Sequence, residues 1–138
     1  MKKHTFHLFS LLLLAVAFST FSSCEKDEGK LPSIEFKTGT GYTAADKIVG
    51  QGEIVVVGIK AAKTEDKDVL KSFDVSVSLD GGPNTSIQNK TLSGSEGDNY
   101  EVDVPLVMRS QAGTEKYTFT VVNRDGLVNS VSLTLTVQ

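Results

Sequence analysis

The stretch VSLTLTV, residues 131–137, alternates apolar and polar residues without interruption. Successive side chains of a β-strand point to opposite faces of the sheet, so this alternation gives the strand one apolar face and one hydroxyl-bearing face. The apolar face consists of Val131, Leu133, Leu135 and Val137. Because a second layer has to cover such a face, the stretch predicts a strand in a sheet that is buried on one side.

The same period of two recurs in several earlier segments. It is clear in residues 73–79, 100–106 and 117–121, and less regular in residues 34–36, 53–60 and 85–92. In the first part of the chain, Gly58 and Lys60 mark the outward parity of their segment. Farther along, Ile87 and Leu92 fall on opposite parities, so we expect a bulge or an early end there. Together these segments predict about seven strands.

Turn-forming sequences separate the predicted strands. They are GQG at 50–52, DGGPN at 80–84, SGSEGDN at 93–99, SQAGTE at 110–115 and NRDG at 123–126. Such spacing predicts an all-β fold, an antiparallel sandwich with three strands against four. The DGGPN turn should pair residues 72–79 with residues 85–92, and Pro105, which cannot donate to a ladder, should lie in an edge strand. We expect at most one helical turn, within residues 66–71.

Residues 1–23 have the three-part layout of an export signal. Lys2 and Lys3 form a basic start, an apolar run covers residues 6–18, and small residues follow. A retained transmembrane helix would need about 20 unbroken apolar residues, and the polar residues inside this segment leave fewer. We therefore expect a cleaved leader.

Cys24 is the only cysteine of the chain and comes directly after two serines. This arrangement resembles the lipobox of bacterial lipoproteins, although Phe21 stands where that family usually has Leu or Val. The resemblance implies that Cys24 becomes the first residue of the mature chain and carries lipid, including fatty acyl chains such as palmitate. The other interpretation is a free or disulfide-forming thiol, but a single cysteine has no partner within the chain.

The charged segment that follows is expected to be a solvated tether, residues 24–30. Its acidic residues resemble the surface-export signal of lipoproteins from the Bacteroidota. This resemblance implies a lipid anchor in the bacterial outer membrane with the domain displayed on the cell surface. The alternative is retention on the periplasmic face.

Residues 112–137, AGTEKYTFTVVNRDGLVNSVSLTLTV, resemble the last two strands of bacterial immunoglobulin-like and PKD-like domains. The resemblance implies a seven-stranded, immunoglobulin-like β-sandwich over residues 31–138. It also implies that Tyr117 is a corner tyrosine, with a buried ring and a hydroxyl bonded to nearby backbone. The whole chain resembles short Bacteroidota lipoproteins that consist of one such domain.

Composition argues against several kinds of chemistry. The chain carries 14 basic and 17 acidic residues; without Lys2 and Lys3, residues 24–138 carry 12 basic and 17 acidic residues, a net charge of −5. Such a balance is a poor match for nucleic acid. Both histidines, His4 and His7, lie in the predicted leader, so histidine-based triads and zinc sites are not expected. We assign no catalytic residue, no metal ligand and no cofactor.

Two acidic loops and one tyrosine are the remaining candidates for a site. Oxygen ligands of Glu65, Asp66 and Asp68, or of Glu96 and Asp98, would suit calcium, but no twelve-residue calcium loop is present. We interpret these loops as solvated. Tyr42 could stack on a sugar ring, and packing against the sandwich is the expected alternative.

Other polar residues are interpreted without a binding role. Lys60, Lys71, Lys90 and Arg109 should serve solubility and edge protection. Asn84 and Asn89 lie in glycosylation sequons, which carry no weight in a bacterial lipoprotein.

These observations lead to a functional hypothesis: a membrane-anchored, non-enzymatic recognition or adhesion module for a glycan, a host protein or an envelope protein. The alternative is a structural or assembly subunit of a larger cell-envelope complex, in which residues 131–137 lie beside a partner's edge strand. An enzyme would need a pair of carboxylates as acid and base, and no pair stands out.

Overall fold

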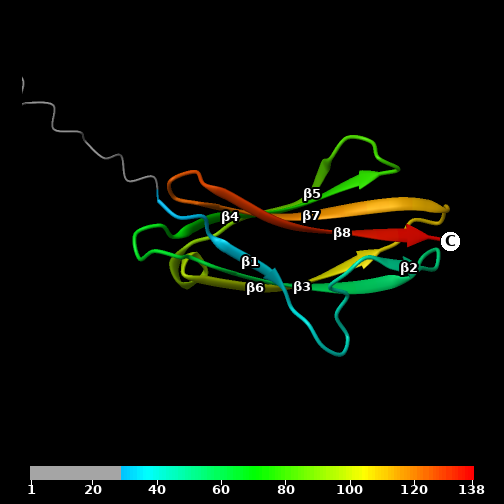
Figure 1. Cartoon of the computed structure of the whole chain (residues 1–138), viewed down its shortest axis with the longest axis horizontal. Coiled ribbons are helices and arrows are strands. Elements are labelled where there is room, and N and C mark those ends of the chain that lie inside the picture. The colour runs from blue at the N-terminus through cyan, green and yellow to red at the C-terminus, as the bar shows by residue number, and fades with distance from the viewer. Residues whose placement is uncertain (1–28) are drawn as a thin grey trace, which may run out of the picture.

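The computed structural model describes residues 29–138, which form a two-layered β-sandwich (Figure 1). The predicted leader and Cys24 lie outside these residues. The strands are β1 (Ser33–Phe36), β2 (Lys47–Val49), β3 (Ile54–Ala62), β4 (Leu70–Leu79), β5 (Thr85–Thr91), β6 (Asn99–Val107), β7 (Gly113–Asn123) and β8 (Val128–Val137). A short 3₁₀ turn, η1 (Gly94–Gly97), precedes β6.

The strands divide unequally between the two layers. One sheet has three strands in the order β1-β3-β6, and the other has five in the order β2-β8-β7-β4-β5. All pairs are antiparallel except β2 with β8, which run parallel. The prediction of an all-β sandwich is confirmed. The predicted strand count was one too low, because β2 was missed and the layers are three against five.

The missed strand is short and has no sequence period of its own. β2 contains three residues, of which Val49 is buried while Ile48 is exposed. It is held by its ladder to β8 and by the amide of Gln138, which donates to the Val49 carbonyl over 3.0 Å. Three residues are too few to display an alternation, so local sequence could not reveal β2.

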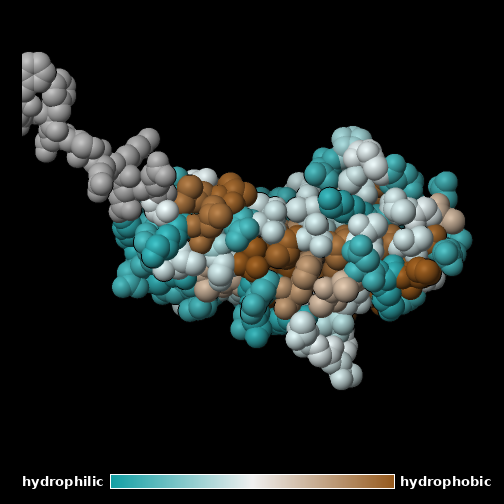
Figure 2. Space-filling view, viewed as in Figure 1, coloured by the Kyte–Doolittle hydropathy of each residue, from teal (hydrophilic) through white to brown (hydrophobic). Residues whose placement is uncertain are grey.

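The core lies where the inward faces of the two sheets meet. The ring of Phe119 meets that of Phe36 edge to face with centroids 5.9 Å apart, and the rings of Phe73 and Tyr100 are 5.3 Å apart. All four apolar residues predicted for residues 131–137 pack inward, although Val131 is only partly buried. Figure 2 shows an apolar strip along the opening between the layers, beside β1 and β8.

The β4–β5 hairpin follows from its turn sequence. Asp80 and Gly81 have φ angles of 52° and 77°, and the amide of Gly82 donates to the carbonyl of Leu79 over 2.9 Å. Two consecutive positive φ angles are typical of the tight hairpin turn that an Asp-Gly pair favours. The predicted pairing is confirmed, and of the expected bulge or early end the structure shows the bulge: Val75 pairs with Gln88 and Ser76 with Ser86, so Ile87 is the extra residue on β5.

Two further expectations concern Pro105 and the helical turn. Pro105 lies in β6, an edge strand, as predicted. The expected helical turn at residues 66–71 is wrong. Those residues form turns and the start of β4, and the helical turn within residues 29–138 is η1.

Replacing Phe119 by Ala tests the contact between the layers. The ring is fully buried, so its removal should lower the free energy of unfolding by about 3 to 5 kcal/mol. Urea denaturation of the purified protein measures this change. The neighbouring Thr118→Ala, on the outward face, should change stability by less than about 0.5 kcal/mol. Equal effects of the two substitutions would contradict the assigned register.

Candidate functional site

The outer face of the three-stranded sheet carries a depression of about 420 Å³. It lies beneath the loop of residues 37–46, which leaves β1 and projects below the sheet in Figures 1 and 2. The lining residues come from β1, this loop, β3 and β6; they are Glu35, Phe36, Lys37, Thr38, Tyr42, Lys60 and Glu101. The depression thus combines the ring of Tyr42 with charges of both signs, while the ring of Phe36 meets Phe119 in the core.

Gly58 makes room for the side chains that cross this face. A Cβ at Gly58 would lie 2.8 Å from Cε1 of Tyr42 and 2.7 Å from Cβ of Lys37. Any larger residue at position 58 would therefore displace one of them. The backbone of the loop is fixed to β3 at two points, because the Lys37 amide donates to the Gly58 carbonyl and the Thr43 amide to the Val56 carbonyl, each over 2.8 Å.

Tyr42 lies across β3 with its hydroxyl above β6. The hydroxyl donates to Oδ2 of Asp103 over 3.1 Å, and the residue is half-buried. Gly58 on β3 and Asp103 on β6 are directly opposite each other in the ladder. The Tyr42 side chain therefore crosses the sheet along this pair, from Gly58 to Asp103. Tyr42 packs against the sandwich, as one of the two expectations held. It also lines an open depression, which the other expectation, stacking on a sugar ring, would require.

Lys37 links the two acidic residues of β6 that face outward. Its ammonium donates to Oδ1 of Asp103 over 3.0 Å and lies 3.2 Å from Oε2 of Glu101. The hydrogen bond to Asp103 raises the pKa of Lys37, and the same bond lowers the pKa of Asp103. Both groups are therefore charged at neutral pH, which fixes a line of donors and acceptors beside the Tyr42 ring.

Cross-strand pairs of outward-facing residues on β3 and β6 lie on both sides of Tyr42, and they differ in polarity between the two sides. On one side lies the pair Lys60 and Glu101, and on the other lie Val56 with Pro105 and then Ile54 with Val107. Ile54 and Val107 are 63% and 65% exposed. A ligand with both polar and apolar surfaces would find partners for each along this face.

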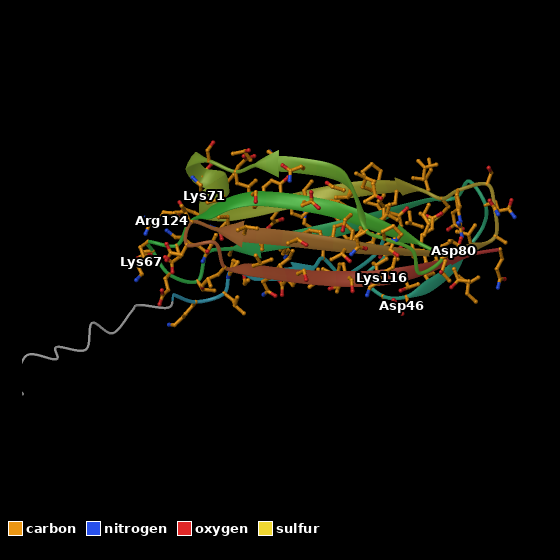
Figure 3. The ribbon with its side chains drawn as sticks, turned by 90° about the horizontal axis from the view of Figure 1, so that it is seen from above. Asp46, Lys67, Lys71, Asp80, Lys116 and Arg124 are labelled. Carbon is orange, nitrogen blue, oxygen red and sulfur yellow. The ribbon has the colours of Figure 1, made fainter. Side chains whose placement is uncertain are left out.

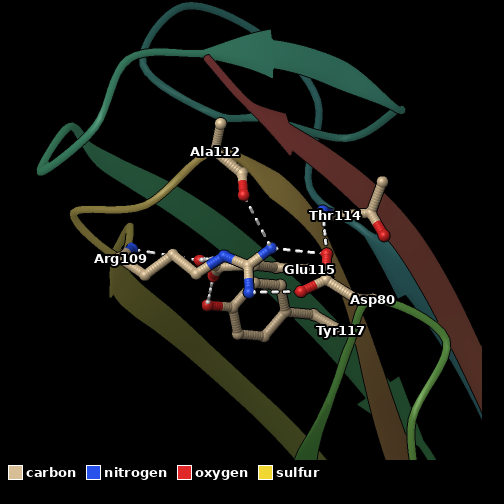
Figure 4. A network of polar contacts seen from close by, with 6 residues as sticks. All are labelled: Asp80, Arg109, Ala112, Thr114, Glu115 and Tyr117. Carbon is tan, nitrogen blue, oxygen red and sulfur yellow. Dashed lines mark hydrogen bonds and ion pairs between the residues drawn. The ribbon is translucent and has the colours of Figure 1, made fainter.

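A second polar cluster joins the β4–β5 turn to the start of β7 (Figure 4). Both terminal nitrogens of Arg109 donate to the Asp80 carboxylate over 2.6 Å, and the Thr114 amide donates to Asp80 over 2.8 Å. The bond from Arg109 is the main cause that lowers the pKa of Asp80 to about 2. The interpretation of Arg109 as an edge-protecting surface residue was wrong, because it clamps two connections together.

Tyr117 belongs to the same cluster and differs from the expectation in one respect. Its ring is buried as predicted, but its hydroxyl donates to Oε2 of Glu115 over 2.5 Å instead of to backbone. Burial is the main cause that raises the pKa of Tyr117, and the bond to Glu115 raises it further. Glu115 also accepts the Arg109 amide over 3.0 Å, so the buried carboxylate is satisfied locally and its role is structural.

The acidic loop residues have unequal environments. Asp66 is fully exposed, and Glu96 and Asp98 pair with Lys90 and Lys63 at 2.6 and 2.8 Å. Asp68, by contrast, is 1% exposed and its oxygens have no hydrogen-bond partner. The interpretation of the whole loop as solvated was therefore wrong for Asp68.

The outer face of the five-stranded sheet has a different character. It presents short polar side chains, which include Ser72, Asp74, Ser76, Thr118, Thr120, Ser130 and Ser132. In Figure 3, which looks onto this sheet, Lys67, Lys71 and Arg124 lie near one end, and Asp46, Asp80 and Lys116 near the other. Of the sequon residues, Asn84 is exposed and Asn89 donates to Asp74 over 3.1 Å.

The other lysines singled out from the sequence lie apart from one another. Lys60 is at the rim of the depression, and Lys90 lies 5.0 Å from the ring centroid of Tyr100 at the opening of the core. The predicted lipidation site, Cys24, lies outside the described residues. Within residues 29–138, no helix is long and apolar enough to cross a membrane.

Comparisons with solved structures support the fold alone. A superoxide reductase (neelaredoxin) from Ignicoccus hospitalis has a TM-score of 0.52 and 10% sequence identity, covering 79% of this chain and 81% of that chain. A DUF4466 family protein from Parabacteroides merdae has a TM-score of 0.50 and 13% identity, covering 76% of this chain and 44% of that chain. No protein-family model and no curated protein sequence matches the chain.

The Asp80–Arg109 clamp predicts a specific dependence of stability on pH. The pKa of Asp80 in the folded protein, about 2, is below its ordinary value of 3.8, so the charged form stabilises the fold above about pH 4. This contribution is lost as the pH falls from 4 towards 2. The melting temperature of the protein should exceed that of Asp80→Asn at pH 7, and the difference should close below pH 4.

Thermal unfolding followed by circular dichroism between pH 2 and pH 8 measures this difference. Asp66→Asn, at a fully exposed carboxylate, is the matched control and should show little difference at any pH. A difference for Asp80→Asn that stays constant down to pH 2 would refute the clamp.

Proposed function

We propose that this chain is a lipid-anchored, non-enzymatic recognition module of the bacterial outer membrane, and that it binds a glycan at the depression beside Tyr42. One observation carries the proposal: the loop of residues 37–46 holds an aromatic ring, with its hydroxyl hydrogen-bonded, at the wall of an open polar depression. The lipobox-like context of Cys24 supports the anchor.

The chemistry of the depression suits a sugar ring. A pyranose presents hydroxyl groups at its edge and C–H groups on its faces, so it needs polar partners around an aromatic side chain. Lys60, Glu35 and Glu101 supply donors and acceptors at the rim, while Tyr42 supplies the aromatic surface. The volume of about 420 Å³ lies in the range of small-molecule sites and accommodates one or two sugar rings.

The charges of the depression favour recognition over catalysis. Glu101 and Asp103 both lie within ion-pair distance of Lys37, and the hydrogen bond from Lys37 lowers the pKa of Asp103, which favours its charged form. A glycosidase needs one protonated carboxyl as an acid beside a second, ionised carboxylate. The carboxylates at this face are arranged as hydrogen-bond acceptors, and we assign them to ligand binding.

The alternative function, assembly into a larger envelope complex, has support from a different strand than expected. The edge of β8 is partly covered, since β2 pairs with residues 135–137 and Asp46 accepts the Thr134 amide over 2.8 Å. β5 is instead an edge strand with all but one residue exposed, and Ile87 is one of its exposed residues. A partner strand would therefore add to β5.

Substitution of Tyr42 tests the glycan site. The purified protein in detergent is first applied to a glycan array, and its affinity for a bound oligosaccharide is then measured by calorimetry. Tyr42→Ala should weaken binding at least about tenfold, equivalent to about 1.4 kcal/mol, because the ring contact is lost. Tyr42→Phe isolates the contribution of the hydroxyl, and Lys116→Ala, on the opposite sheet, should leave affinity unchanged.

Two outcomes oppose the proposal. One is an array on which the protein binds nothing, and the other is binding that Tyr42→Ala leaves intact. Crosslinking in intact envelopes then separates the functions, since one stoichiometric protein partner joined through β5 would support assembly.

A further inference from the structure

Asp68 is a buried carboxylate at the end of the sandwich where the chain enters it. The residue is 1% exposed, and neither Oδ1 nor Oδ2 has a hydrogen-bond partner. Three positions earlier, Oε2 of Glu65 is also buried without a partner. One short loop between β3 and β4 thus contains three buried carboxylate oxygens without hydrogen-bond donors.

Such an arrangement is costly unless something compensates the charge. An ionised carboxylate loses several kcal/mol of solvation free energy on burial. Native proteins almost always offset this loss with hydrogen-bond donors, opposite charges or metal ions. Lys30 lies 3.5 Å from Oε1 of Glu65, but its own side chain is mostly exposed, so that pair is weak. Within residues 29–138, no hydrogen bond compensates the Asp68 carboxylate.

A third carboxylate flanks the same place from the β7–β8 turn. A Cβ built on Gly29 would lie 3.2 Å from Oδ2 of Asp68 and 3.5 Å from Oδ2 of Asp125. Gly29 has a φ angle of +63°, which favours glycine, and the missing side chain at this position leaves space beside both carboxylates.

Hydrogen bonds already fix both acidic turns to the entering chain. Thr64 Oγ1 donates to the Leu31 carbonyl over 2.9 Å, and Asn123 Nδ2 donates to the Lys30 carbonyl over 3.3 Å. Asn123 Oδ1 in turn accepts the amides of Asp125 and Leu127. The backbone that carries the three carboxylates is therefore held in place, and only side-chain rotations remain free.

We propose that Asp68, Glu65 and Asp125 bind a calcium ion at this end of the sandwich. Calcium accepts six to eight oxygen ligands in flexible geometry, and carboxylates, backbone carbonyls and water can supply them together. Zinc and copper prefer nitrogen or sulfur ligands, and residues 29–138 contain neither His nor Cys. Magnesium demands a stricter octahedron and keeps more of its water.

Binding requires side chains to move, because among residues 29–138 no group of three acidic side chains is placed to hold a metal ion in the arrangement that the structure shows. Asp68 is fixed by burial, whereas the side chains of Glu65 and Asp125 are 25% and 38% exposed and can rotate towards it. The ion would then join the β3–β4 loop to the β7–β8 turn.

The test compares thermal unfolding of the purified protein in about 5 mM calcium chloride and in EGTA, with magnesium chloride as a control. Extracellular calcium modules have dissociation constants of about 10⁻⁴ to 10⁻³ M, so this concentration should raise the melting temperature by about 4 °C or more. Magnesium should have a much smaller effect. Asp68→Asn should abolish the calcium-dependent shift.

Asp66→Asn is the matched control, because Asp66 lies in the same loop and is fully exposed. It should keep the full shift. Titration calorimetry with calcium gives an independent readout, in which Glu65→Gln should weaken binding at least about tenfold even if Asp68→Asn does not fold.

Three results would overturn the proposal. The first is a protein whose melting temperature is the same in calcium and in EGTA. The second is an equal loss of the shift in the Asp66 and Asp68 variants, which would indicate a nonspecific charge effect. The third is an equal rise of the melting temperature in Asp68→Asn with and without calcium, which would identify Asp68 as an uncompensated carboxylate.

Discussion

The contact between the inward faces of the two sheets, where the rings of Phe119 and Phe36 meet, is the constraint on which the rest of the structure depends. It determines which parity of every strand points outward. On β3, the burial of Val57 and Ile59 forces Gly58 to the outer face. The position without a side chain therefore lies where the loop of residues 37–46 crosses the sheet, and the candidate site follows from the packing of the core.

Sequence alone predicts those parts of the fold that repeat a local pattern. The alternation of residues 131–137, the turn sequence at Asp80 and Gly81 and the edge position of Pro105 all reflect local chemistry, and the structure confirms them. β2 could not be predicted, because its three residues become a strand only through pairing with β8. The misplaced helical turn has a similar cause, since the β4 ladders begin at Leu70 and override a weak local preference.

The candidate sites depend on contacts between residues far apart in the chain, which limits what the sequence reveals about them. Tyr42 stood out as a loop aromatic, but its partner Asp103 lies 61 positions away and no local motif connects them. Asp68 resembled its solvated neighbours in sequence, and its burial in the folded protein, beside Gly29, has no local signal. The useful sequence signal at the first site was Gly58, a glycine at the outward parity of a strand, which marks a close approach from another segment.

Hydrogen–deuterium exchange of the purified protein, resolved by segment, tests most directly that the buried contact between the sheets governs the structure. Amides of β4 and β7, which have partner strands on both sides and bury aromatic rings, should exchange most slowly. Amides of β5, at an exposed edge, should exchange much faster although β5 belongs to the same sheet. Equal protection of β5 and β7, or rapid exchange throughout β4 and β7, would contradict the two-layered core described for residues 29–138.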